Sequence, residues 1–266
     1  MRFGIVAKVD KKEAVVTAKK VVDFLRKKAE VVVEEQTGKK IGRKGKPLKK
    51  MKADIMIAVG GDGTILRTLQ ACNATVFGIN AGAVGFLTEV TPDNAIDGLN
   101  RILRNDYVVD KRTKIKVMLN SERLYDCVNE VVIHTAHIAK MRHFEIFIDN
   151  VKAEDIRADG IIVATPTGST CYAMSVGSPI LDPRVDAFVI APIAPFKLSA
   201  RPIVVPAKSR ITITCSKGPS LLVLDGQYER EVEKDDIMSF TASKTPARFI
   251  RFDHNFYRRI REGLIL

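Results

Sequence analysis

The stretch with the clearest chemical potential is Gly60-Gly-Asp-Gly-Thr64, which directly follows the apolar run 55–59. An apolar run that ends in glycines is typical of a buried parallel strand entering a tight turn. Glycines let backbone N–H groups face a ligand, and a helix starting near Thr64 would aim its positive end at the same place. Both features favour a bound phosphate.

Asp62 is the unusual residue of this turn, because a carboxylate repels the phosphate that the turn would attract. The carboxylate is useful if it accepts a proton from a nucleophile, or if it helps to order a metal ion and a hydroxyl group. A helix cap is the alternative, since Asp is common at that position. The sequence predicts Asp62 as the catalytic residue and leaves its exact role open.

A second polar stretch runs from Asp159 to Tyr172. The short apolar segment 160–164 leads into the turn Thr165-Pro-Thr-Gly-Ser-Thr170. Hydroxyl groups and turn amides can bind sugar and phosphate, and Tyr172 offers a ring face to a base. By itself this pattern also fits an ordinary Ser/Thr turn.

The elements that must position these residues differ between two parts of the chain. Up to about residue 104, strands alternate with helices, which predicts a layered, mainly parallel sheet. The expected strands and helices are 2–9, 11–28, 31–35, 54–60, 64–72, 75–79 and 95–104. A second glycine-bearing turn, 80–89, follows the strand 75–79. Open α/β sheets place their ligands at such neighbouring strand ends.

From Tyr107 the chain changes to short alternating segments, which predict a β-rich domain. The expected strands are 114–120, 123–127, 130–135, 144–148, 160–164, 187–190, 210–215, 221–224, 240–242 and 248–252. We therefore predict an N-terminal α/β domain over 1–105 and a C-terminal, sandwich-like β domain over 106–252. A C-terminal helix within 253–266 is expected to return to the first domain and complete it.

The net charge of +12 is concentrated in one segment. Residues 39–52 hold eight basic side chains and no acidic one, so the rest of the chain carries +4. This segment either attracts a polyanionic substrate or is a solvated loop. It lacks interleaved aromatic residues, so we predict no nucleic-acid partner.

Other features point to an ordinary reduced globular protein. No apolar run approaches the ~20 residues that a membrane span needs, so we predict no membrane association. The four cysteines are far apart and form no ligand motif, as expected for buried thiols in the cytoplasm. His134 and His137 would point to opposite faces of a strand, which argues against a zinc site. Neither standard nucleotide-binding fingerprint is present.

The order of the motifs resembles that of the NAD kinase family. The matching segments are Gly60–Thr64, Asn80-x-Gly-x-x-Gly-Phe-Leu-Thr88, Asn129-Glu130, Asp159-Gly160 with the turn through Tyr172, and Leu224-Asp-Gly-Gln227. The first turn alone is shared with lipid kinases and phosphofructokinases. The Asn-Glu pair and the Thr/Ser turn are specific to NAD kinases. Cys171, Ser178 and Phe196 depart from common family residues (Ala, Gly and His) without removing a motif residue.

The resemblance implies transfer of a terminal phosphoryl group to the 2′-hydroxyl of the adenosine ribose of NAD. ATP or polyphosphate would be the donor, with a divalent metal such as Mg²⁺, in a cytoplasmic homodimer or homotetramer. It implies a catalytic Asp62 and no fixed protein ligand for the metal. The NAD-binding residues would be Gly63, Phe86, Asn129, Glu130, Asp159, Thr170, Tyr172 and Ser175.

On the donor side we place Gly60, Gly61, Thr64 and Asp225, although an Asp-Gly turn between strands explains Asp225 equally well. Two other functions stay open at this point. One is a lipid or other small-molecule kinase with the same glycine turn, and the other is a non-catalytic NAD-binding regulator. The Asn129-Glu130 pair disfavours the first, and Asp62 beside two glycine turns disfavours the second.

Overall fold

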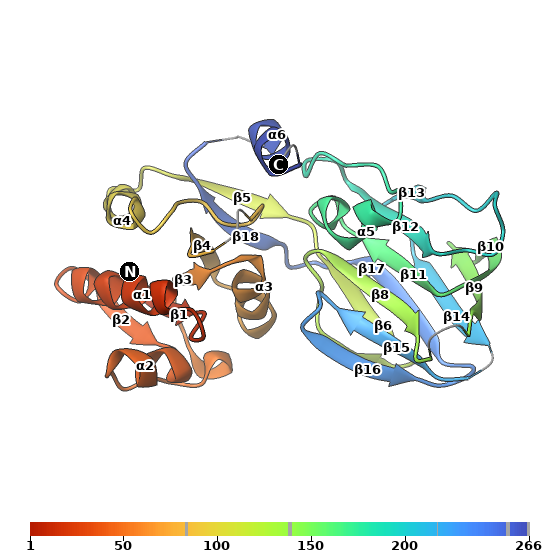
Figure 1. Ribbon diagram of the computed structural model, residues 1–266, viewed down its shortest axis with the longest axis horizontal. Helices are drawn as coiled ribbons and strands as arrows, with labels where there is room; N and C mark the ends of the chain where they lie inside the picture. Colours follow the sequence, from red (N-terminus) through yellow and green to blue (C-terminus); the bar gives the residue numbers. More distant parts are fainter. Residues whose placement is uncertain (83–84, 138–139, 217, 254–255, 265–266) are drawn as a thin grey trace. The chain divides into compact units, whose positions relative to one another are not determined.

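The structure is a computed structural model of the 266-residue chain. It describes residues 1–82, 85–137, 140–216, 218–253 and 256–264. The chain divides into two compact units, one formed by Met1–Lys111 with Ala247–Leu266 and the other by Arg112–Pro246. Figure 1 shows the elements of both units, and each unit is described by itself.

The first unit is built on a six-stranded sheet with the order β2-β1-β3-β4-β18-β5. Its strands are β1 (Arg2–Ala7), β2 (Glu30–Val33), β3 (Ile55–Gly60), β4 (Thr75–Asn80), β5 (Val108–Arg112) and β18 (Ala247–Arg251). The pairs among β1, β2, β3 and β4, and the pair of β18 with β4, are parallel. The helices are α1 (Lys12–Leu25), α2 (Glu35–Ile41), the 3₁₀ turn η1 (Leu48–Lys50), α3 (Asp62–Ala71), α4 (Ala95–Leu103) and α6 (Phe256–Leu264).

Helices cover both faces of this sheet, which explains why its central strands are continuous apolar runs. On one face, α1 and α4 share a core with Phe3, Ile57 and Phe77. On the other, Ile65 of α3 lies so close to Gly78 of β4 that a methyl group there would come within 2.6 Å of it. Strands buried on both faces need apolar residues at every position. Because β1, β3 and β4 are parallel, their carboxyl ends meet at one edge of the sheet.

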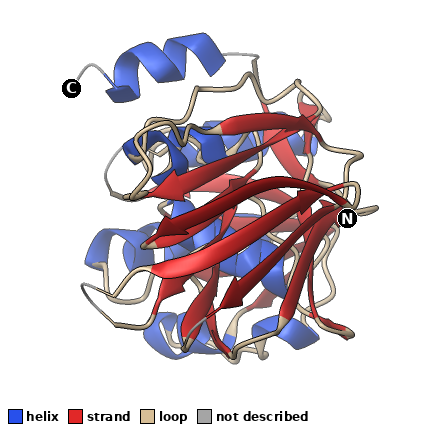
Figure 2. Cartoon of the chain, turned by 90° about the vertical axis from the view of Figure 1, so that its right-hand side faces the viewer, coloured by secondary structure: helices blue, strands red, loops and turns tan. Residues whose placement is uncertain are grey.

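The second unit is a β-sandwich, and Figure 2 shows how strongly strands dominate it. One antiparallel sheet has the order β10-β9-β14-β17-β6-β7 and the other β13-β12-β11-β8-β15-β16. The first contains β6 (Ile115–Leu119), β7 (Glu122–Arg123), β9 (Arg142–Ile148), β10 (Val151–Ala158), β14 (Ile211–Ser216) and β17 (Ile237–Ala242). The second contains β8 (Glu130–Thr135), β11 (Gly160–Ala164), β12 (Ala187–Ile193), β13 (Ile203–Pro206), β15 (Ser220–Leu224) and β16 (Tyr228–Val232).

The core of the sandwich receives side chains from both sheets, such as Phe144 and Phe240 from one and Ile161 and Phe188 from the other. A smaller cluster on the opposite face of β8, β11 and β12 includes Ala173 of the short helix α5 (Tyr172–Ser175). The turn before α5 contains the 3₁₀ segment η2 (Gly168–Thr170). This cover explains why β11 is apolar at every position.

The predicted fold class is confirmed, and several local expectations differ from the structure, among them the strand expected at 123–127, of which only Arg123 belongs to β7. The strand expected at 248–252 in the second domain is β18, which pairs with β4 in the first sheet. The basic segment was expected to be a loop, but its first residues belong to α2, where the Glu34 carboxylate accepts the Thr37 N–H and Gly42 closes the helix with positive φ. The strands β5, β10, β13 and β16 were not expected.

Candidate active site

Asp62 is the first residue of α3 and follows the carboxyl end of β3. We expected the helix to begin near Thr64, two residues later. The N-cap residue is Gly61, and it makes no side-chain capping bond. The Asp62 carboxylate instead accepts the N–H groups of Phe86 (2.9 Å) and Leu87 (3.1 Å), which lie in the loop after β4. Asp62 is thus held across two strand ends.

The surroundings of Asp62 favour its protonated form more than water does. Partial burial raises the pKa of its carboxyl group above the ordinary value of 3.8. The two backbone N–H bonds and the positive charges of Arg251 and Arg259 act in the opposite direction but do not cancel the effect of burial. A carboxylate with a raised pKa is a better proton acceptor at neutral pH.

Gly60 and Gly85, one in each turn, are required by close approaches. A methyl group at Gly60 would come within 2.4 Å of the Thr64 hydroxyl, and one at Gly85 within 2.3 Å of the Asp62 carboxylate. At Gly61 a methyl group would meet nothing within 4 Å, so its backbone faces open space. Gly63 is exposed on α3, whereas Thr64 is buried. The turn can therefore present bare backbone to a ligand.

Two lysines at the same sheet edge escaped the sequence analysis. The backbone N–H of Lys8, just after β1, donates to the carbonyl oxygen of Val59 at 2.9 Å. The Nζ of Lys11 lies beside Gly82, where a methyl group would come within 2.5 Å of it. Both residues follow β1, a strand with no motif, so only its expected place next to β3 could have drawn attention to them.

In the second unit, Asn129 and Glu130 lie at the start of β8. Glu130 is paired with Ala164 at the end of β11, and Val131 with Leu224 at the end of β15. The three motifs of this unit are therefore neighbours. The loop before β8 carries Asn129, whose amide Nδ2 donates to the Cys171 sulfur at 3.4 Å.

The carboxylate of Asp225 binds backbone N–H groups of its own unit, whereas we had placed it beside the phosphates of the donor. It lies in the turn between β15 and β16, with positive φ at Asp225 and Gly226 and a bond from Gln227 N–H to the Leu224 carbonyl. Its carboxylate accepts the N–H groups of Val128 (2.8 Å), Asn129 (2.8 Å) and Glu130 (3.2 Å). The alternative of an Asp-Gly turn is the one observed, and Asp225 positions the Asn-Glu pair.

The turn after β11 packs against the same backbone. The Thr165 hydroxyl donates to the Val128 carbonyl at 2.5 Å, and the Thr165 N–H donates to the Asn129 carbonyl at 2.8 Å. A methyl group at Gly168 would come within 2.1 Å of the Asn129 carbonyl oxygen, so only glycine fits there. The turn and Asp225 hold residues 128–130 from two sides.

This frame leaves two acceptors without partners. Asn129 Oδ1 and Glu130 Oε2 are buried and accept no hydrogen bond from the residues that the structure describes. A buried acceptor without a donor costs free energy, which a ligand that supplies donors would recover. Hydroxyl groups of a sugar are such donors.

We expect Glu130→Gln to change the pH dependence of stability. Burial, and then the charge of Asp225, raise the pKa of Glu130 from 4.5 to about 8. Between pH 4.5 and about 8, the folded protein keeps Glu130 protonated, whereas the unfolded chain has released this proton. The free energy of unfolding therefore falls as the pH rises through this range. Gln cannot ionise, so the Tm of the variant minus that of the wild type should increase across this window. A constant difference would contradict the prediction.

The remaining predicted NAD-binding residues are distributed unevenly. Thr170 is buried, whereas Tyr172 is 41% exposed and Ser175 is also exposed on α5. Phe86 lies in the first unit and is half-buried. Asp159 precedes β11 and lies at the opposite end of that strand from Glu130, roughly 16 Å along an extended chain. The structure does not bring Asp159 together with the Asn-Glu pair in one chain.

The described residues contain no cluster of three or more His, Cys, Asp or Glu side chains that could hold a metal ion. Within the same ranges, no helix is long and apolar enough to cross a membrane. Cys72, Cys127, Cys171 and Cys215 form no disulfide within the described residues.

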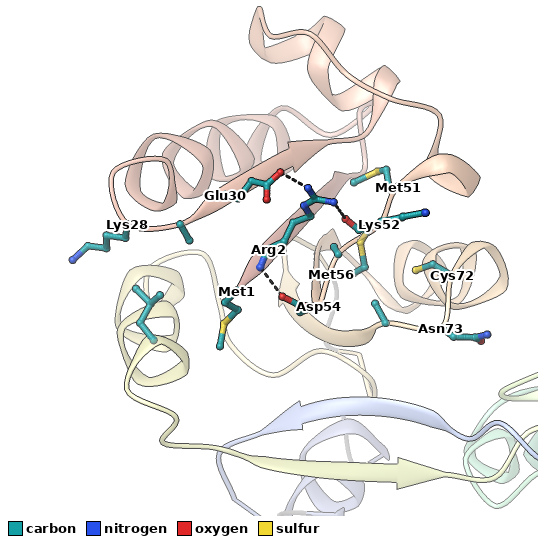
Figure 3. A pocket seen from close by; sticks show the side chains of 14 residues that line it. Met1, Arg2, Lys28, Glu30, Met51, Lys52, Asp54, Met56, Cys72 and Asn73 are labelled. Atoms are coloured by element: carbon teal, nitrogen blue, oxygen red, sulfur yellow. Dashed lines mark hydrogen bonds and ion pairs between the residues drawn. The ribbon is translucent and has the colours of Figure 1, made fainter.

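A pocket of about 890 Å³ lies on the first unit, and Figure 3 shows its lining. Arg2, Glu30 and Asp54 lie in it at the amino ends of β1, β2 and β3, which is the sheet edge opposite to Asp62. Arg2 already donates to the Glu30 carboxylate and the Lys52 carbonyl. This pocket is therefore distinct from the glycine turns and not part of the candidate site.

Comparisons with known proteins cover nearly the whole chain. Residues 3–107 match the ATP-NAD kinase N-terminal domain, and residues 128–252 match the ATP-NAD kinase C-terminal domain. The NAD kinase of Methanothermobacter thermautotrophicus is 46% identical, over 100% of this chain and 96% of that protein. The NAD kinase of Thermoplasma volcanium is 39% identical, over 100% and 98%.

Solved structures agree with these matches. An NAD kinase from Archaeoglobus fulgidus in complex with ATP has a TM-score of 0.81 and 31% identity, covering 98% of this chain and 99% of that one. Yeast NADH kinase complexed with NADH has a TM-score of 0.93 at 21% identity, covering 100% and 88%, and shows the fold alone. The matches and the glycine turn define a phosphotransferase. The chain belongs to the NAD kinase family.

Proposed function

We propose that this protein transfers the terminal phosphoryl group of ATP to the 2′-hydroxyl of the adenosine ribose of NAD, which gives NADP. The observation that carries the proposal is the pair of buried acceptors without donors, Asn129 Oδ1 and Glu130 Oε2. They lie next to the turn 165–170, and the Asn129 amide contacts Cys171, the residue before the exposed Tyr172. Acceptors for a sugar and a face for an aromatic ring suit a nucleoside.

Asp62 is the proposed proton acceptor. As the 2′-oxygen bonds to the terminal phosphorus, the bond from that phosphorus to the bridging oxygen breaks and ADP leaves. The hydroxyl proton passes to the Asp62 carboxylate. A sugar hydroxyl is a weak nucleophile, so a positioned base and stabilisation of charge on the phosphoryl oxygens lower the barrier.

The donor phosphates are proposed to lie against Gly60, Gly61 and Thr64. The positive end of α3 and the bare backbone of the turn support this assignment. Mg²⁺ would neutralise charge on the transferred group. It is commonly bound by substrate phosphates and water, which fits an edge without a cluster of acidic side chains in the described residues. Polyphosphate is a second possible donor with the same chemistry.

Self-association and a cytoplasmic location complete the proposal. Asp159 lies far along β11 from Glu130, so a second chain in a homodimer or homotetramer would explain its NAD contact. Four cysteines without a disulfide in the described residues are compatible with the reducing cytoplasm. Light scattering of the purified protein tests the assembly.

Lys11→Ala is expected to raise the KM for ATP about tenfold while the KM for NAD stays nearly unchanged. The reason is that Lys11 Nζ lies beside the glycine turn at Gly82, where it can neutralise a donor phosphate. Lys12→Ala is the matched control, since Lys12 is the next residue, is equally exposed and begins α1. Equal changes in both constants, or equal effects of the two variants, would contradict the donor role.

The activity is tested by incubating the purified protein with NAD, Mg²⁺ and either ATP or polyphosphate. NADP is then measured with a dehydrogenase that uses only NADP. We expect NADP with at least one donor. Binding of NAD without NADP formation would instead support a non-catalytic regulator.

A further inference from the structure

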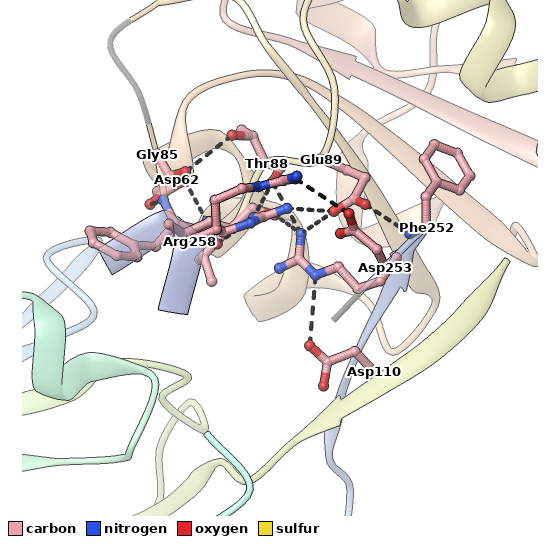
Figure 4. A network of polar contacts seen from close by, with 12 residues as sticks. Asp62, Gly85, Thr88, Glu89, Asp110, Phe252, Asp253 and Arg258 are labelled. Atoms are coloured by element: carbon pink, nitrogen blue, oxygen red, sulfur yellow. Dashed lines mark hydrogen bonds and ion pairs between the residues drawn. The ribbon is translucent and has the colours of Figure 1, made fainter. Parts of the chain in front are cut away.

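The loop Gly85–Glu89, which holds Asp62, is itself held by arginines from the C-terminal part of the chain. Arg259 of α6 donates from Nη1 to the Phe86 carbonyl at 2.8 Å and also to the Thr88 carbonyl. Arg251 of β18 donates to the carbonyls of Leu87 (3.0 Å) and Thr88 (3.1 Å). Figure 4 shows this network around Asp62 and Glu89.

Glu89 ties the two arginines together. Its Oε2 accepts from Arg251 at 2.9 Å and from Arg259 at 2.6 Å, and its Oε1 accepts the Phe252 N–H at 2.8 Å. The side chains of Glu89 and Arg251 are 3% and 4% exposed. Charged groups buried this deeply need a paired charge and hydrogen bonds, and Glu89 supplies both to Arg251.

One peptide group connects this network to Asp62. The Phe86 carbonyl accepts from Arg259, and the Leu87 N–H of the same peptide donates to Asp62. The carbonyl and N–H of a planar trans peptide point in opposite directions, so the guanidinium and the carboxylate bind its two ends. A cation at the carbonyl polarises the peptide and makes its N–H a stronger donor.

We propose that Arg259 is a positioning residue for phosphoryl transfer, which orients the Asp62 carboxylate through the Phe86–Leu87 peptide. The inference rests on the proposed function of Asp62. The positive charges of Arg251 and, to a smaller extent, Arg259 also favour the ionised form of Asp62. The C-terminal helix α6 therefore contributes to the reaction although the motifs of the sequence lie elsewhere.

Other charged side chains also lie near the loop that binds Asp62. Arg251 faces the loop from β18, Glu89 belongs to the loop, and Asp110 of β5 lies 3.6 Å from the Arg251 Nε. Lys11 lies beside Gly82 in the preceding turn. Arg259 donates to the carbonyl of the Phe86–Leu87 peptide, whose N–H binds Asp62, so its substitution tests this relay directly.

The test is the pH dependence of kcat for Arg259→Gln, compared with Arg258→Gln. Arg258 is the next residue on α6, is 54% exposed and pairs with Asp253 at 3.3 Å. We expect Arg259→Gln to lower kcat about 10- to 100-fold with little change in the KM for NAD. Loss of the positive charge raises the pKa of Asp62 further, so the acid limb of the profile should move to higher pH. Arg258→Gln should match the wild type.

An unmoved acid limb in folded Arg259→Gln, or equal effects of the two variants, would overturn the proposal. If Arg259→Gln does not fold, Arg259→Lys decides. Lys keeps the positive charge but lacks the planar guanidinium with its several N–H donors. We therefore expect kcat to fall while the acid limb of the pH profile stays in place. A wild-type kcat would overturn the proposal. Asp62→Asn distinguishes failure of the proposed function of Asp62 from failure of the positioning by Arg259. Wild-type turnover of Asp62→Asn refutes the function of Asp62, whereas an inactive Asp62→Asn beside an unaffected Arg259→Gln refutes only the relay.

Discussion

Asp62→Asn is expected to lower kcat by about 10²- to 10⁴-fold, the usual contribution of a general base. The KM for NAD should stay within about threefold of the wild type, because the residues proposed to bind NAD are Asn129 and Glu130, which this substitution leaves unchanged. The amide keeps one acceptor for the N–H groups of Phe86 and Leu87 but cannot accept the hydroxyl proton. Steady-state kinetics with NAD and ATP measure both constants.

Asp97→Asn is the matched control for this prediction. Asp97 is also an Asp in the first turn of a helix of the first unit, on α4, and it is exposed. Its substitution should leave kcat and Tm unchanged. Turnover of Asp62→Asn close to that of the wild type would show that Asp62 is not the base. The wild-type enzyme should also lose activity toward acid at a higher pH than an ordinary Asp would give, because the pKa of Asp62 is raised.

The second large effect is expected for Asp225→Asn, which should raise the KM for NAD at least about tenfold and lower Tm. The Asp225 carboxylate is 4% exposed and accepts three backbone N–H groups from residues 128–130. An amide NH₂ in its place must face one of these donors. Loss of a buried hydrogen bond to a charged group costs about 1.5–3 kcal/mol, which corresponds to several degrees in Tm.

Asp235→Asn controls for the backbone geometry. Asp235 has positive φ like Asp225, but it is exposed and pairs only loosely with Lys234 in the described contacts. Asn tolerates this conformation, so the control should match the wild type in Tm and in the KM for NAD. A variant of Asp225 that loses stability but keeps its KM would restrict this residue to folding and contradict its function in positioning Asn129 and Glu130.

The fold could be predicted where local pattern and burial agree. The runs 55–60 and 160–164 are apolar at every position because both of their faces are covered, and both were predicted as strands. Edge strands gave a weaker signal. β16 has the sequence Tyr-Glu-Arg-Glu-Val, and only its last residue is buried, so its periodicity does not distinguish it from a loop.

The candidate site could be predicted only in part, because its supporting contacts join residues far apart in the sequence. Asp62 was predicted from the chemistry of its turn, and Asn129 and Glu130 from the resemblance to NAD kinases. Nothing local indicates that Arg259 contacts Phe86, 173 positions away, or that Asp225 binds the N–H groups of residues 128–130. The carboxylate of Asp225 was assigned to phosphates because its backbone partners are invisible in the sequence.

The most direct test of the proposed function is the structure of the product made from NAD, Mg²⁺ and ATP. Phosphorus NMR of the purified product should show one new phosphomonoester on the 2′-oxygen of the adenosine ribose, with ADP in equal amount. Asp62→Asn, assayed in parallel, should yield almost none. Absence of the product with both ATP and polyphosphate, or a phosphate on another hydroxyl, would contradict the assignment of this protein as an enzyme that converts NAD into NADP.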